Sequence, residues 1–320
     1  MKARLLVATI PAVLAPSILA GCGDSTGPDT PLVWSSVAIG TTSPLSSVWG
    51  TSSSDVWVVG WLGTVLHYNG ATWSSVTPGF AQYPNKIWAS SPSDVWIIGT
   101  GGIVTEAAGF PTIQHYDGTS WSIARVPTPE LLMGIWGSSA SDVWVADIGG
   151  ELAHYDGTSW LWTENGLTSA LNAVSGTSAS DVWAGGGGIL HYNGTSWSRV
   201  ANGLVIGVWG SSPSDVWAVG RGVSIHYNGS GWSSVPIKPG FPEFPDAVWA
   251  SSQSNAWVVG SSELPGTCCS GRIAHYDGTT WSDDVSIGAL PRLHAIWGSS
   301  ASDVWVVGDG GTLLHGTPAR

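Results

Sequence analysis

The chain has 320 residues, of which 43% are apolar, and it carries 22 acidic against 10 basic side chains. The apolar fraction is too high for a disordered protein. The net charge of −12 argues against a nucleic-acid partner, because such a partner needs a basic patch. Abundant glycine and tryptophan with few charges favour an all-β secreted domain.

Residues 1–21 have the pattern of a secretory signal peptide. Lys2 and Arg4 precede a mostly apolar stretch, and small residues lead up to Cys22. The stretch is too short, and too interrupted by Pro11 and Pro16, for a membrane span. We therefore expect residues 1–21 to be removed. The mature chain then has 8 basic against 22 acidic residues, a formal charge of −14.

The Leu-Ala-Gly-Cys sequence that ends at Cys22 resembles the lipobox of bacterial lipoproteins. This resemblance implies that Cys22 is lipidated and that residues 22–31, which are polar and rich in Gly and Pro, form a flexible tether. It also implies a place in the cell envelope. The lack of Asp directly after Cys22 favours the outer membrane, by analogy with enteric lipoproteins, and leaves the side open. An ordinary signal peptide with an incidental cysteine is the alternative.

From residue 32 onward the chain repeats one phrase seven times, roughly Trp-Gly-Ser-Ser-x-Ser-Asp-Val-Trp-x-x-Gly and, after a gap, His-Tyr-Asp/Asn-Gly-Thr-x-Trp-Ser. The Trp of the Asp-x-Trp element recurs about every 41 residues, at Trp57, Trp96, Trp144, Trp183, Trp217, Trp257 and Trp305. This period is typical of four-stranded propeller blades.

One repeat predicts four short strands. In the second copy these are residues 86–89, 95–99, 113–116 and 121–126, here called A to D, with a polar turn between A and B and an Asp-Gly turn between C and D. One such sheet cannot bury both of its faces. The copies must therefore stack, and radial stacking gives an all-β, seven-bladed β-propeller over residues 32–318.

The seventh repeat is split between the two ends of the chain. Its copy stops at Gly316 without a strand D, whereas residues 32–37 match the strand D of the first repeat, residues 73–76. We expect the N-terminal strand to complete blade seven, which closes the ring and removes the edges of an open sheet.

The recurrent polar residues predict structural roles, because a group used at symmetric positions is rarely catalytic. The Asp before each strand B Trp is replaced by Asn255 in blade six. The repeated histidines lie in different blades, too far apart to share a metal; they are His67, His115, His154, His191, His226, His275 and His315. Twenty of the tryptophans form three ring series on strands A, B and D, and Ser175 interrupts the A series.

These repeats resemble the WD40/YVTN/BNR-like propeller repeats of secreted bacterial lipoproteins. The Asp-Gly-Thr-x-Trp turn is similar to the Asp-box of sialidase-like and kelch-like propellers, but it lacks the residue that the Asp-box has between Asp and Gly. The family is functionally mixed, so the resemblance implies a fold and transfers little activity.

Strand direction assigns the loops to two faces. A–B and C–D turns lie on a constant face of near-identical sequence, and B–C gaps and D–A crossovers lie on a variable face. Binding sites favour variable loops on a rigid scaffold. The candidate binding residues, all assigned to the variable face, are Phe80, Tyr83, Phe110, Phe241, Phe244, Asp246, Glu263, Arg272 and His294.

The residue three before each strand A Trp is expected near the channel mouth. These residues are Ser46, Asn85, Met133, Asn172, Ile206, Asp246 and His294. Asp246, His294 and Ser46 lie on consecutive blades, but no nucleophile-elbow pattern surrounds Ser46, so no catalytic triad is assigned. Local mini-cores of the loop aromatics are the alternative to a binding surface.

No metal or cofactor motif occurs in the sequence. Cys268 and Cys269 are adjacent in the blade-six B–C gap, residues 261–272, where they form a vicinal disulfide or two free thiols. We expect a monomeric, membrane-anchored binding or scaffolding propeller for envelope protein or glycan partners, without catalytic residues. The alternatives are a carbohydrate-active enzyme, either a sialidase-like hydrolase or a lyase, and a multivalent lectin that uses the repeated turns of the constant face.

Overall fold

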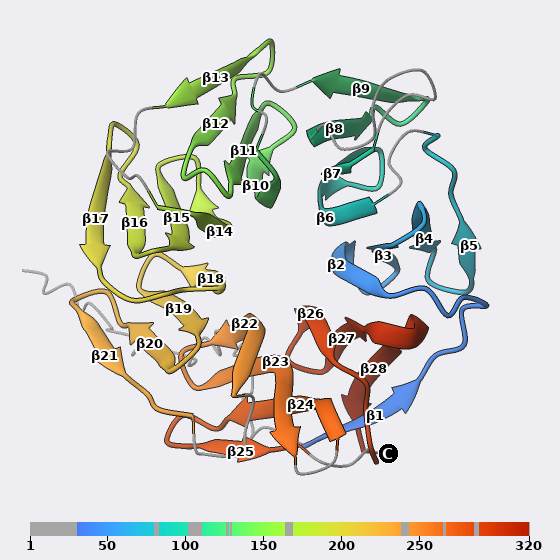
Figure 1. Cartoon of the computed structure of the whole chain (residues 1–320), viewed down its shortest axis with the longest axis vertical. Helices are drawn as coiled ribbons and strands as arrows, with labels where there is room; N and C mark the ends of the chain where they lie inside the picture. The colour runs from blue at the N-terminus through green and yellow to red at the C-terminus, as the bar shows by residue number, and fades with distance from the viewer. Residues whose placement is uncertain are drawn as a thin grey trace, which may run out of the picture.

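The chain forms a ring of seven four-stranded antiparallel sheets in a computed structural model (Figure 1). The structure describes residues 31–79, 83–101, 111–125, 128, 130–163, 169–237, 243–264, 267–284 and 288–319. The predicted seven-bladed, all-β propeller is confirmed. The expected signal peptide and nearly all of the tether lie outside the described residues.

Six blades are built from four consecutive strands each, from the inner strand A to the outer strand D. Blade one is β2 (Leu45–Ser52), β3 (Asp55–Gly60), β4 (Thr64–Tyr68) and β5 (Trp73–Ser75); blade two is β6 (Tyr83–Ser91), β7 (Asp94–Thr100), β8 (Pro111–Tyr116) and β9 (Trp121–Arg125); blade three is β10 (Leu132–Ser139), β11 (Asp142–Asp147), β12 (Leu152–Tyr155) and β13 (Trp160–Thr163). Blade four is β14 (Leu171–Ser178), β15 (Asp181–Gly186), β16 (Ile189–Tyr192) and β17 (Trp197–Ala201); blade five is β18 (Gly207–Ser212), β19 (Asp215–Gly220), β20 (Val223–Tyr227) and β21 (Trp232–Ser234); blade six is β22 (Phe244–Ser252), β23 (Asn255–Leu264), β24 (Thr267–Tyr276) and β25 (Trp281–Asp283).

The seventh blade joins the two ends of the chain, as the split repeat predicts. It contains β26 (Leu293–Ser300), β27 (Asp303–Gly308) and β28 (Leu313–Pro318), with the 3-10 turn η1 (Asp309–Gly311) before β28 and with β1 (Leu32–Ser36) as its outer strand. β1 lies beside β28 in this sheet (Figure 1), and Trp34 pairs with Gly316. The indole of Trp34 also donates to Asp284 at 2.8 Å, which ties the closing strand to blade six.

Each strand B is the core of its blade. All six residues of β3, Asp-Val-Trp-Val-Val-Gly, are buried, whereas the outer β5 is largely exposed. Two buried faces explain the continuous apolar run of this strand, and one solvated face explains the polar residues of strand D. Measured against the sequence prediction, the strands extend by one to three residues and the A–B turns are correspondingly shorter, as in β6 and β7.

A repeated Asp–His hydrogen bond and a repeated Trp–His ring stack explain the recurrent Asp, His and Trp. In blade two, Asp94 accepts hydrogen bonds from Ser90 Oγ at 2.5 Å, Trp96 Nε1 at 3.1 Å and His115 Nε2 at 2.7 Å. The Trp96 and His115 rings stack with centroids 3.8 Å apart. The Asp–His contact recurs in six blades, and in blade six Asn255 Oδ1 accepts from His275. The predicted structural role of these residues is confirmed.

Aromatic side chains join neighbouring blades. The Trp96 ring lies 5.2 Å from that of Tyr155 and 5.9 Å from that of Trp160, both in blade three. Blade seven contacts blade one in the same way, through Trp305, Tyr68 and Trp73. Ring closure therefore reproduces the ordinary interface between blades, and offset or edge-on ring pairs stabilise it beyond their buried area.

The sequence predicts a loop for the blade-six insertion, but the structure has a hairpin there. Residues 261–272 extend β23 and β24 into a long hairpin, in which Ser261 pairs with Gly271 and Ser262 with Ser270. The pairing reaches Leu264 with Thr267 at the far end of the hairpin. Cys268 and Cys269 thus lie in β24; their side chains, and with them the vicinal disulfide, fall outside the described part.

Candidate functional site

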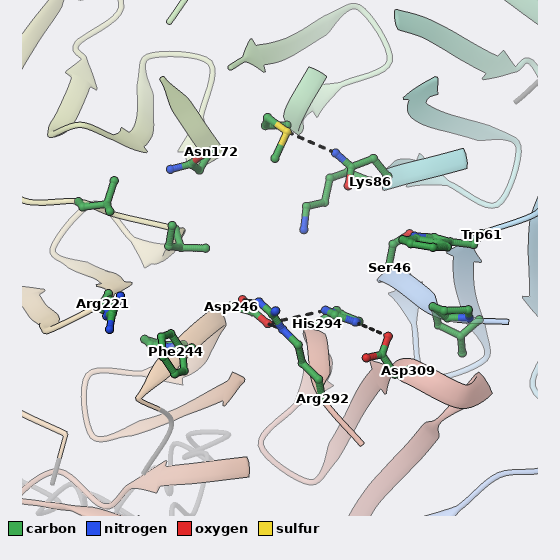
Figure 2. Close-up of a pocket in the computed structure, with 17 residues that line it drawn as sticks. Ser46, Trp61, Lys86, Asn172, Arg221, Phe244, Asp246, Arg292, His294 and Asp309 are labelled. Atoms are coloured by element: carbon green, nitrogen blue, oxygen red, sulfur yellow. Dashed lines mark hydrogen bonds and ion pairs between the residues drawn. The ribbon is translucent and has the colours of Figure 1, made fainter. Parts of the chain in front are cut away.

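The seven predicted channel-mouth residues line one cavity. Ser46, Asn85, Met133, Asn172, Ile206, Asp246 and His294, one from each blade, surround a space of about 730 Å³ at the variable end of the central channel (Figure 2). The other ten lining residues lie within two positions of a ring residue or in the turns after strand B. The volume is in the range of small-molecule and peptide side-chain pockets.

Two tryptophans close the channel on the other side of this cavity. Trp49 of blade one and Trp209 of blade five belong to non-adjacent blades, yet their ring centroids are 5.8 Å apart, so the rings meet across the channel. Both line a much smaller space of about 110 Å³ between the inner strands. The large cavity therefore has a floor and opens toward the variable face.

Glycine and alanine at one repeat position explain why these two rings turn inward. The strand A Trp of most blades lies over a glycine of the next blade, as Trp297 lies over Gly50, where an added Cβ would come within 2.6 Å of the ring. Blades two and six carry Ala89 and Ala250 instead, and the Trp49 and Trp209 indoles donate to their carbonyl oxygens at 3.0 and 2.9 Å. The methyl group of Ala at this position prevents the Trp ring of the preceding blade from lying as close to the backbone as it does over Gly.

A charged cluster lies on the wall between blades six and seven. Arg292 donates two hydrogen bonds to the Asp246 carboxylate, from Nε at 2.8 Å and from Nη2 at 2.7 Å. His294 lies between two carboxylates, with Nε2 2.9 Å from Asp309 Oδ1 and Nδ1 3.7 Å from Asp246 Oδ2 (Figure 2). Burial lowers the pKa of His294, but both carboxylates outweigh it and leave that pKa raised. For Asp246, burial raises the pKa and the His294 and Arg292 contacts outweigh it, so its pKa is lowered.

Lys86 projects from β6 into the space opposite this cluster (Figure 2). Within the described ranges its ammonium has no hydrogen-bond or ion-pair partner, and Asp246 is the charge whose attraction reaches it. Desolvation in the channel lowers the pKa of Lys86, and this attraction offsets the effect only in part. The ammonium is thus positioned for a ligand.

The rim of the cavity is apolar and aromatic. Trp61 and Tyr83 are 53% and 45% exposed, and their rings meet edge to face with centroids 6.1 Å apart. On the other side, Leu204 is 53% exposed and the Arg221 guanidinium lies over the Phe244 ring, 4.9 Å from its centroid. Such a rim offers both apolar area and cationic donors to a ligand.

The predicted site residues are only partly brought together. Phe244, Asp246 and His294 line the cavity, and Tyr83 lies beside it against Trp61. Arg272 lies further out in blade six, where its guanidinium contacts Ser262 and Asp283. Phe80, Phe110 and Phe241, and the side chain of Glu263, lie outside the described part of the chain.

The three residues considered as a triad do not form one. Ser46 Oγ donates to the carbonyl oxygen of Pro84 at 2.7 Å, and both ring nitrogens of His294 face carboxylates. No imidazole nitrogen is left to accept the serine proton, which nucleophilic catalysis requires. These contacts fix the channel wall instead.

Several cavity residues are not among the candidate binding residues predicted from the sequence. Five of these residues flank the ring in the structure and are not repeated from blade to blade: Trp61, Leu204, Arg221, Arg292 and Asp309. Lys86 follows directly after the ring residue Asn85, where the other blades have Ser, Gly or Ala. The available signal was this departure from the repeat, because a long charged residue at a small-residue position next to a channel has no structural purpose.

Comparison with known proteins supports the fold and leaves the family open. No family model and no curated protein matches the sequence. Among solved structures, YCF48 from Cyanidioschyzon merolae is 16% identical, with a TM-score of 0.68 over 89% of this chain and 99% of that one. A structure of YCF48 bound to D1 peptide has the same identity and TM-score over 91% and 100%. A streptogramin B lyase is 14% identical, with a TM-score of 0.72 over 92% and 100%.

Two searches of the described residues bear on metals and membranes. In that part of the chain no group of three His, Cys, Asp or Glu side chains is placed to hold a metal ion. The same residues contain no helix of the length and hydropathy that a membrane crossing requires.

Proposed function

We propose that this protein is a non-enzymatic binding or scaffolding propeller whose ligand enters the cavity on the variable face. The observation that carries the proposal is a combination of three features: a cavity of about 730 Å³ with a floor, the Lys86 ammonium in its wall, which has no partner among the described residues, and an exposed apolar rim. Binding sites combine apolar area with a few convergent polar groups in this way. A propeller of similar fold, YCF48, has been observed with a peptide.

A carbohydrate-active enzyme has less support from the same residues. Glycoside hydrolysis needs a carboxylic acid and a carboxylate free to act on the substrate. The two cavity carboxylates of the described part, Asp246 and Asp309, are held by Arg292 and His294. The lowered pKa of Asp246 keeps that carboxylate ionised, so it is unsuited to act as the general acid.

A multivalent lectin also has less support, because the repeated turns use their own polar groups. Asp117 Oδ1 accepts hydrogen bonds from the backbone N–H groups of Thr119 and Ser120, both at 2.8 Å. These bonds hold the pKa of Asp117 at about 2. Tyr116 donates to the carbonyl oxygen of Gly118 in the same turn. The turns are therefore stabilised internally, as Asx-turns are.

The cell-envelope location remains part of the proposal. Cys22 would carry the lipid, residues 22–31 would form the tether, and β1 begins at Leu32, so the propeller would stay close to the membrane. We place the anchor in the outer membrane and expect a monomeric propeller. Metabolic labelling with a fatty-acid analogue tests the anchor: wild type should be labelled and Cys22→Ser should not, and equal labelling of both would refute lipidation.

Binding through the variable face is tested with two leucines of equal exposure. Leu204 lies at the cavity rim and is 53% exposed, whereas Leu161 lies on the outer strand β13 and is 54% exposed. Wild type, Leu204→Ala and Leu161→Ala serve as baits on a glycan array and in pull-down from envelope extract.

We expect Leu204→Ala to weaken capture of the partner about 5- to 30-fold, which corresponds to about 1–2 kcal/mol for an interface anchor. Leu161→Ala should match wild type. Equal capture by all three baits would show that binding does not use the cavity. Several equivalent sugar sites per chain would favour the lectin, and turnover of a polysaccharide would favour the enzyme.

A further inference from the structure

The cavity concentrates positive charge on an acidic protein. Three of the 8 basic residues of the expected mature chain, Lys86, Arg221 and Arg292, line it, against the two carboxylates of Asp246 and Asp309. His294 adds a further cation when protonated, which its two carboxylate neighbours favour. A molecule with a formal charge of −14 therefore presents a locally cationic pocket, and oppositely charged ligands are the ones that such a pocket attracts.

Lys86 is the cation best placed to meet a ligand. Arg292 is already held by Asp246 through two hydrogen bonds, and Arg221 lies at the rim over Phe244. The Lys86 ammonium points into the open space and has no bonding partner in the described part of the chain (Figure 2). A partly desolvated ammonium gains most from an anionic hydrogen-bond acceptor.

The turn next to Lys86 exposes apolar side chains under backbone strain. Leu62 is 76% exposed and has φ 57°, a left-handed conformation that disfavours branched L-residues, and Gly63 follows with φ 70°. Thr64 N–H closes the turn onto the Trp61 carbonyl oxygen at 3.2 Å. Asn or Gly is the usual residue in the position of Leu62. An exposed leucine in a strained position indicates selection for contact with a partner.

Aliphatic side chains around the mouth favour a peptide over a sugar. Leu131, Ile148 and Leu204 are 44%, 40% and 53% exposed and leave the same ends of strands A and B as the Trp61–Leu62 turn. Branched aliphatic side chains bind apolar peptide side chains by removing apolar surface from water, and they have no hydrogen-bonding group for the hydroxyls of a sugar. The channel amides add acceptors: Asn85 and Asn172 use Nδ2 to bond the next blade, and no donor of the described residues reaches their Oδ1 atoms.

We propose that the ligand is an extended peptide segment that places an Asp, Glu or C-terminal carboxylate at Lys86 and apolar side chains against Trp61, Leu62 and Tyr83. This inference rests on the proposed function and names the partner class of the same cavity. The carboxylate would accept a hydrogen bond from Lys86 Nζ. The apolar residues would cover the strained turn at the rim.

The experiment is a selection from random 12-residue peptides displayed on phage, with the mature full chain carrying Cys22→Ser as target. Enriched peptides are synthesised with a fluorescent label, each with a partner peptide in which Asp or Glu is replaced by Asn or Gln and the C-terminus is amidated. Binding is measured by fluorescence polarisation for wild type, Lys86→Gln, Lys86→Arg, Leu62→Asn and Arg199→Gln. Arg199 is the charge control, because it lies on the outer strand β17 and outside the cavity lining.

We expect enriched peptides to combine a carboxylate with Leu, Ile or aromatic residues. Lys86→Gln and loss of the peptide carboxylate should each raise Kd about 10- to 100-fold, without adding to one another, since a charged hydrogen bond is lost in either case. Lys86→Arg should retain most of the affinity and Arg199→Gln should stay within twofold. Leu62→Asn should weaken binding at least fivefold while raising the thermal midpoint, which separates contact from folding.

The contrary results are distinguishable. Enriched peptides without a carboxylate preference, or Lys86→Gln within twofold of wild type, would overturn this inference and leave the proposed binding function intact. If no peptide is enriched but the Leu204-dependent capture of a partner or glycan persists, the peptide inference is overturned and the proposed binding function stands. Failure of both the selection and the capture would refute the proposed function as well.

Discussion

Replacement of Asp94 tests whether the repeated Asp is a structural centre of the blade. Asp94 is 8% exposed and accepts hydrogen bonds from Ser90, Trp96 and His115. Asp94→Ala leaves three donors without their acceptor. The acceptor is a carboxylate, so all three bonds are charge-assisted and contribute about 1.5–3 kcal/mol each. Since the His115 side chain is 26% exposed and can reach water, we expect a total near the lower end, about 4 kcal/mol.

Blade six provides the matched substitution. Asn255 Oδ1 accepts from His275 at 2.6 Å, and its Nδ2 donates to Ser251 Oγ at 2.9 Å, so the amide keeps the histidine bond and reverses the serine bond. Asp94→Asn should therefore cost only about 1 kcal/mol, the difference between a charged and a neutral acceptor.

The assay is urea unfolding followed by tryptophan fluorescence and circular dichroism, with both probes required to coincide before free energies are compared. The expected order of the free energy of unfolding is wild type, Asp94→Asn, Asp94→Ala. The reasoning fails if Asp94→Ala costs less than about 1 kcal/mol, or if Asp94→Asn costs as much as Asp94→Ala.

Three further predictions concern stability. Trp217 is 0% exposed, so Trp217→Ala should lower the free energy of unfolding by about 3–5 kcal/mol. A loss below about 1 kcal/mol would contradict its place in the blade interface. Leu62→Asn should stabilise the fold by about 1 kcal/mol through relief of the left-handed strain, and a destabilised variant in thermal unfolding would refute that account. Stability should fall from about pH 4 toward pH 2. Hydrogen bonds lower the pKa of several Asp residues in the folded state, to about 2 for Asp117, Asp156 and Asp277, and the stability that they contribute is lost as pH falls through those values. A urea midpoint that does not change between pH 5 and pH 2 would exclude this linkage.

The repeat by itself determined the architecture. Seven copies of the Asp/Asn-x-Trp element specified the number of blades, and the split last repeat specified the pairing of β1 with β28, because a strand pattern that recurs with its turns leaves few alternative pairings. Symmetry also separated structural from functional residues correctly for Asp94, His115 and their equivalents. The ring of seven channel residues followed from counting back from each strand A Trp.

Only the tertiary structure decided what the channel contains. The inward turn of Trp49 and Trp209 depends on whether the next blade offers a glycine or an alanine, a contact between residues about 40 positions apart. The Arg292–Asp246 pair and the unpaired Lys86 likewise come from three different blades. A periodic sequence specifies the structure that all blades share, since the shared residues make the same local bonds in each blade. A site on the ring axis is assembled from the residues in which the blades differ. Those residues come together only when the ring closes.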